Sequence, residues 1–68
     1  MDAKKIGEKI RKLREDQGQT KAFLSRKFGV SYSTVCSWEY GERIPNDVCK
    51  KKIADHFGVP VTFFFEDK

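Results

Sequence analysis

Residues 20–41, with the sequence TKAFLSRKFGVSYSTVCSWEYG, contain two short helical patterns with a glycine between them. The first pattern covers Lys21–Phe28, where Leu24 and Phe28 stand four residues apart and so share one face of a helix. Gly29 comes directly after it, and glycine readily takes the left-handed conformation that ends many helices. The spacing therefore predicts a short helix that stops at Gly29.

The second pattern covers Tyr32–Tyr40, and Ser31 before it can accept a hydrogen bond from a backbone N–H of the first turn. Val35 and Trp38 stand three residues apart on its apolar side. The opposite side presents Tyr32, Ser33, Cys36 and Ser37. Two short helices joined by a turn that contains glycine, the second with a polar outer face, are typical of the helix-turn-helix, which binds DNA. We therefore expect a DNA-binding domain whose helix-turn-helix covers about residues 20–40.

A longer helix is expected before this motif, covering Asp2–Gln17. Ile6, Ile10 and Leu13 recur at the spacing of one helix face and would form its apolar stripe. Gly7 lies inside the same pattern, where glycine costs about 1 kcal/mol relative to alanine. Close approach of another helix is one reason for a glycine at this position.

Two further elements are expected after the motif. Asn46 can cap a fourth helix, which Gly58 ends. The apolar residues of that helix are Cys49, Ile53, Ala54 and Phe57. Residues 60–65, PVTFFF, have a composition that also fits an extended strand, but proline suits the start of a helix, and we expect a short helix. These assignments predict one all-α domain of five helices over residues 1–68.

The composition is compatible with a nucleic-acid partner. The 68 residues carry 14 Lys and Arg against 10 Asp and Glu, a formal net charge of +4, and so modest an excess favours polyanions only weakly. The longest apolar run, Phe63–Phe65, is far shorter than the ~20 residues that span a bilayer, and we expect its side chains in the core. No secretory signal follows Met1, so we expect a cytoplasmic protein.

The reactive residue types give no sign of an enzyme or of a metal site. Cys36 and Cys49 are thirteen residues apart without a CxxC pattern, so free thiols are expected, although a disulfide stays open. His56 stands alone, with no metal-ligand spacing and no nucleophile–base arrangement around it. We therefore expect no catalytic residue, no metal and no cofactor.

The residues in and after the motif follow an order that is typical of one family. They are Thr20, Lys21, Leu24, Phe28, Gly29, Val30, Ser31, Thr34, Val35, Trp38, Glu39, Gly41, Pro45, Ile53, Ala54, Phe57, Gly58 and Val59. This order resembles the lambda-repressor-like, Cro-type (xenobiotic-response-element) helix-turn-helix family. The resemblance extends from Ile6 to Phe65, and the stretch from Ser31 to Gly41 followed by Pro45 is its most specific part. It implies a compact five-helix, lambda-repressor-like fold whose second and third helices form the motif, with the third helix in the major groove of double-stranded DNA.

The resemblance also implies roles for particular positions. The residues that it places against bases or the sugar-phosphate backbone are Thr20, Lys21, Ser31, Tyr32, Ser33, Thr34, Cys36, Ser37, Tyr40 and Arg43. It implies a buried salt bridge between Arg14 and Glu39, and an arginine fork suits bidentate hydrogen bonds to a carboxylate. The positions that would read bases hold no Arg, Lys, Asn or Gln, the residues that discriminate guanine and adenine best. We therefore expect lower base discrimination than is typical of the family.

Together these patterns predict a non-enzymatic transcriptional regulator, specifically a repressor or control protein of a bacterium, prophage or mobile element. Weak homodimerisation is expected, unless Phe23 or the Phe-rich C-terminus contributes an interface. Two alternatives stay open: an antitoxin with the same fold, and a protein-interaction module with weak or no specific DNA binding. The second alternative is motivated by the short side chains at most of the positions that would read bases, and by a partly exposed Phe23.

Overall fold

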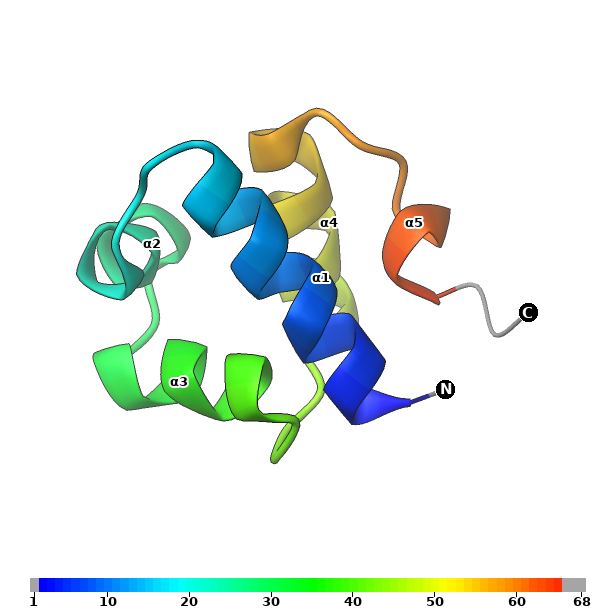
Figure 1. The fold of residues 1–68 in the computed structure, drawn as a ribbon, viewed down its shortest axis with the longest axis horizontal. Helices are drawn as coiled ribbons and strands as arrows, with labels where there is room; N and C mark the ends of the chain where they lie inside the picture. The colour runs from blue at the N-terminus through cyan, green and yellow to red at the C-terminus, as the bar shows by residue number, and fades with distance from the viewer. Residues whose placement is uncertain (1, 66–68) are drawn as a thin grey trace.

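Five α-helices make up the part of the chain that the computed structural model describes, residues 2–65, and no strand occurs there (Figure 1). In chain order they are α1 Ala3–Asp16, α2 Lys21–Phe28, α3 Tyr32–Tyr40, α4 Asp47–Phe57 and α5 Thr62–Phe65. The predicted all-α, five-helix fold is confirmed. The segment that follows Pro60 is helical, so its extended alternative is wrong.

The helix boundaries follow from capping residues that the chain supplies at both ends. Each of the first four helices begins after a side chain whose oxygen accepts a hydrogen bond from a backbone N–H of the first turn. These caps are Asp2, Thr20, Ser31 and Asn46. At the end of α2, Gly29 has a φ of 70°, a left-handed conformation that side chains with a Cβ rarely adopt. Only Val30 and Ser31 separate this glycine from α3, so the turn between the two helices is short.

The helices surround one apolar core. α1 crosses the molecule, with α2 and α3 on one side of it and α5 on the other (Figure 1). α1 packs against α3 and α5, and α2 packs against α3 and α4. The buried apolar side chains come from all five helices and are Ile6, Ile10, Leu24, Phe28, Val35, Trp38, Ile53, Ala54, Phe57 and Phe64. Both α1 and α2 therefore pack against α3 and fix its position.

Leu13 is partly buried and packs against the core, as its place in the apolar stripe of α1 implies. The prediction that the whole run Phe63–Phe65 lies in the core needs correction. Phe63 is 39% exposed, whereas its neighbour Phe64 is 3% exposed, because a single helical turn directs consecutive side chains to different sides. The carbonyl oxygen of Phe63 accepts a hydrogen bond of 2.8 Å from the Lys9 ammonium. The side chain of Phe65 lies outside the part that the structure describes.

The backbones of α1 and α3 approach each other closely at Gly7. A Cβ atom at this position would collide with the carbonyl oxygen of Trp38 and would lie 2.7 Å from that of Glu39. The close approach expected from the sequence is thus confirmed, and it fixes α3 against α1. None of the helices in residues 2–65 is long and apolar enough to cross a membrane.

Candidate nucleic-acid interface

α3 lies at the edge of the molecule, with one side against the core and the other open (Figure 1). On the inner side Val35 is 0% and Trp38 is 3% exposed. The outer side carries Tyr32 and Ser33, which are exposed, and Cys36 and Ser37, which are partly exposed. The residues expected to face bases therefore form the accessible side of a helix whose position is set by its buried side.

Three hydroxyl groups gather at the start of α3. Ser31 Oγ accepts a hydrogen bond of 3.1 Å from the Thr34 backbone N–H, which caps the helix. The same oxygen lies 2.7 Å from Thr34 Oγ1 and 3.2 Å from Ser33 Oγ. Each hydroxyl has one hydrogen to donate and two lone pairs, so the group keeps capacity for a phosphate oxygen or a base edge.

The start of α2 and the end of α3 meet through Lys21 and Tyr40. The Lys21 ammonium donates a hydrogen bond of 3.4 Å to the Tyr40 hydroxyl and lies 5.0 Å from the centre of its ring. The pKa of Lys21 is raised, chiefly by this hydrogen bond, so the charged form is favoured. Tyr40 remains 54% exposed. A cation is thus held at the surface beside the end of α3.

Of the two remaining predicted contact residues, Thr20 directly precedes α2 and Arg43 follows α3. Thr20 is exposed, and its Oγ1 accepts a 3.1 Å hydrogen bond from the backbone N–H of Phe23. Arg43 is also exposed, and its backbone N–H donates to the Ser37 carbonyl oxygen at 3.3 Å. The structure therefore places the sequence-predicted contact residues along α3 and in the segments on either side of it.

A buried ion pair joins α1 to the end of α3. Arg14 Nε donates to Glu39 Oε2 at 2.7 Å, and Arg14 Nη2 donates to Glu39 Oε1 at 3.1 Å. Arg14 Nη1 also donates to the carbonyl oxygen of Gln19 at 2.9 Å. The Glu39 side chain is 0% exposed and that of Arg14 is 12% exposed. The hydrogen bonds to the carboxylate raise the pKa of Arg14. The pair therefore ties α1, the loop before α2 and α3 together.

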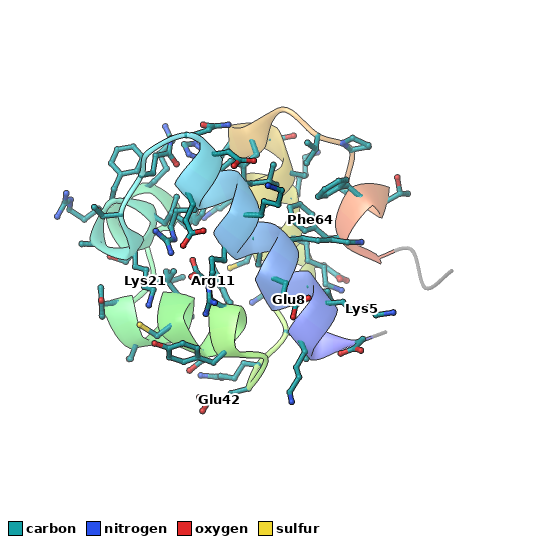
Figure 2. The ribbon with its side chains drawn as sticks, viewed as in Figure 1. Lys5, Glu8, Arg11, Lys21, Glu42 and Phe64 are labelled. Atoms are coloured by element: carbon teal, nitrogen blue, oxygen red, sulfur yellow. The ribbon has the colours of Figure 1, made fainter. Side chains whose placement is uncertain are left out.

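Sequence reasoning missed Arg11, which lies at the same junction. Its Nε is 3.5 Å from Glu39 Oε1, and its guanidinium carbon is 5.9 Å from the centre of the Tyr40 ring. In Figure 2 both Arg11 and Lys21 are labelled in the region between α1, α2 and α3. A signal for it existed in the sequence, because Gly7, Arg11 and Arg14 stand at i, i+4 and i+7 and so share the face of α1 that packs on α3.

His56, for which the sequence suggested no role, lies in an aromatic cluster with residues of α2 and α4. Its ring centre is 5.4 Å from that of Phe28 and 4.8 Å from that of Phe57, both nearly edge-on. His56 Nε2 lies 3.0 Å from Oε1 of Gln19, an acceptor, so this ring nitrogen carries the hydrogen. Burial lowers the pKa of His56, and the positive charge of Lys27 lowers it further.

We expect the domain to lose stability in mild acid because of His56. Its pKa is lower in the folded than in the unfolded chain, so the unfolded chain binds the proton more readily. The free energy of unfolding should therefore be highest above the ordinary histidine pKa of about 6.5 and fall as the pH drops below it. Urea titrations followed by circular dichroism at about pH 7 and pH 5.5 measure this difference. His56→Gln should reduce it, and an unchanged difference would contradict the assignment.

Other reactive groups do not assemble into a site within the described residues. Cys36 and Cys49 are both free thiols and partly exposed. Among residues 2–65 no three His, Cys, Asp or Glu side chains are grouped so that they could hold a metal ion.

Comparison with known proteins agrees with this geometry. The family model described as helix-turn-helix matches residues 10–64. Among solved structures, the fold is similar to the restriction-modification controller protein C.AhdI from Aeromonas hydrophila, with a TM-score of 0.82 and 27% sequence identity over 93% of this chain and 96% of that chain. A search of curated protein sequences gave no match. With a family model matching most of its length, the chain belongs to the helix-turn-helix family of DNA-binding transcription regulators.

Proposed function

We propose that the chain is a sequence-specific transcription regulator that inserts α3 into the major groove of double-stranded DNA. The observation that carries the proposal is the one-sided burial of α3, which exposes Tyr32 at 55% while Trp38 behind it is 3% exposed. The major groove is about 12 Å wide and admits an α-helix. Thr20 and Lys21 at the start of α2, and Arg43 after α3, would then reach the backbone on either side.

Phosphate contacts supply most of the affinity in this proposal. Lys21 binds a phosphate through its ammonium, while Thr20, Tyr40 and Arg43 position the domain on the backbone. Base contacts come from the outer side of α3, which carries hydroxyls, a thiol and a phenol. Serine hydroxyls accept or donate to several bases, and the Tyr32 ring and Cys36 can contact thymine methyl groups. Discrimination between sequences is consequently weaker than with an arginine or glutamine in these positions.

The regulated genes are proposed from the structural similarity. C.AhdI is a restriction-modification controller protein. This similarity supports a bacterial, prophage or mobile-element origin for the chain, and a role in controlling genes of a bacterium, prophage or mobile element. We propose repression, since a domain bound over a promoter can block it without any further activity. Two-fold dimers would read half-sites about 34 Å apart.

A protein-interaction module, or an antitoxin with this fold, is the second candidate. The observation that favours it is Phe23, an aromatic side chain on α2 that is 39% exposed. Fluorescence titration of wild-type protein into labelled random duplex at several salt concentrations separates the candidates. Binding at low salt with a clear salt dependence supports the regulator, and no binding at low salt supports the interaction module.

Lys21→Ala should weaken binding to every duplex alike. The salt slope is the magnitude of the negative slope of log K against log salt. Loss of one phosphate contact lowers it by about one. Lys51→Ala, which removes the same charge from an exposed position on α4, is the matched control and should leave the slope unchanged. Titrations over a range of salt concentrations measure both slopes. A loss confined to one DNA sequence would mean that Lys21 contacts a base instead.

A further inference from the structure

We propose that Arg11 and Lys21 form a two-cation site for the phosphates of one DNA strand, with Tyr40 as the residue that positions both. Arg11 thereby adds a DNA contact from α1, outside the helix-turn-helix. The inference rests on the proposed function, because its ligand is the phosphate backbone of the duplex that α3 would enter.

Tyr40 brings the two cations together from different helices. The Lys21 ammonium, from the first residue of α2, is 5.0 Å from the ring centre, and the Arg11 guanidinium, from the middle of α1, is 5.9 Å from it. Both distances lie within the range of a cation–π interaction. Because Tyr40 ends α3 and is 54% exposed, this arrangement sits at the surface and directly beside the proposed reading helix.

The charge of Arg11 is incompletely neutralised inside the protein. Its one anionic neighbour among the ion pairs of the described residues is Glu39, at 3.5 Å. That carboxylate already accepts hydrogen bonds of 2.7 and 3.1 Å from Arg14, so Arg14 and Glu39 largely compensate each other. The side chain of Arg11 is still 42% exposed. A positively charged group therefore remains accessible beside the same aromatic ring that Lys21 contacts.

Two like charges held around one ring repel each other, and an anion close to both relieves that repulsion. A phosphodiester fits this requirement, since arginine recognises phosphate by bidentate hydrogen bonds and lysine by its point charge. The Tyr40 hydroxyl accepts from Lys21 and keeps its own hydrogen for a phosphate oxygen. Arg11 and Lys21 therefore bind the same phosphate or successive phosphates of one strand.

The test measures salt-dependent binding of the full chain to a labelled duplex. Arg11→Gln should weaken binding roughly tenfold at low salt and lower the salt slope by about one. Lys12→Gln is the matched control, because it removes one charge from the next residue of α1, whose side chain is 78% exposed and 3.6 Å from Asp16. Arg11→Lys should retain the slope, and a double Arg11→Gln, Lys21→Gln variant should lower it by about two.

The outcomes separate this inference from the proposed function. Wild-type protein that does not bind duplex at any salt concentration overturns both. Wild-type protein that binds, with Arg11→Gln behaving as Lys12→Gln does, overturns the Arg11 site alone. A second measurement avoids substitution altogether: the NMR signal of the Arg11 Nε–H should shift together with the backbone signals of α3 when duplex is added. Backbone shifts in α3 without any shift at Arg11 would also refute the site.

Discussion

Glu39→Ala is expected to lower the free energy of unfolding by about 3–5 kcal/mol, the usual cost of removing one partner of a buried ion pair. The Glu39 side chain is 0% exposed and receives two hydrogen bonds from Arg14, whose own side chain is 12% exposed. Without the carboxylate, a buried guanidinium keeps its hydrogen bond to the Gln19 carbonyl oxygen and a 3.9 Å ion pair with Glu15, whose side chain is 62% exposed. A small domain has roughly 5–15 kcal/mol of stability, so a substantial fraction would be lost.

Glu15→Ala provides a control on the same arginine. The Glu15 carboxylate lies 3.9 Å from Arg14 Nη2, but its side chain is 62% exposed, so its removal should change stability by less than about 1 kcal/mol. Urea denaturation of both variants, followed by the helical circular dichroism signal, measures the difference. If Glu39→Ala is no more destabilised than Glu15→Ala, the pair does not stabilise the junction of α1 and α3.

This ion pair also bears on DNA binding. Arg11 Nε lies 3.5 Å from Glu39 Oε1, so the carboxylate sits beneath the proposed phosphate site as well as inside the helix junction. The orientation of α3 relative to α1, and the direction in which Arg11 extends, therefore depend on the same buried group. Stability and the geometry of the proposed interface are coupled at this point.

Helix boundaries could be predicted from the sequence because they depend on neighbours along the chain. Thr20, Ser31 and Asn46 each accept a hydrogen bond from a backbone N–H three residues on, and Gly29 takes the conformation that a helix end needs. The outer face of α3 could also be predicted from periodicity, because Val35 and Trp38, which share the opposite face, are buried.

Contacts between distant segments could not be read in the same way. His56 meets Gln19 across 37 positions of the chain, and Lys9 reaches the Phe63 carbonyl oxygen across 54. The periodicity of α1 shows that Arg11 shares a face with Gly7, but not that Tyr40 stands opposite it. That pairing depends on the distance between α1 and α3, which is set by the packing of both helices.

Substitution of Gly7 tests this approach directly. An alanine Cβ would collide with the carbonyl oxygen of Trp38 and lie 2.7 Å from that of Glu39 and 2.9 Å from its carbonyl carbon. These are backbone atoms inside α3, so no side-chain rotation can relieve the overlap. Gly7→Ala should therefore destabilise the domain by about 3 kcal/mol, even though alanine gains about 1 kcal/mol of helix propensity over glycine. Gly7→Val, with a larger side chain, should prevent the domain from folding, so that no cooperative unfolding transition is observed.

Gly18→Ala is the matched control for Gly7→Ala, since the same atoms are added at a site where the new Cβ meets nothing within 4 Å. Gly18 has a φ of 66°, so alanine there should cost about 1–2 kcal/mol of backbone strain and nothing from collision. The free energies of unfolding of the two variants are compared by thermal and urea unfolding. A Gly7→Ala domain as stable as the wild type would show that α1 and α3 lie further apart than described, and the contact of Arg11 with Tyr40 would then be lost as well. A loss well beyond that of Gly18→Ala would establish that helix contact as the element that sets the position of α3.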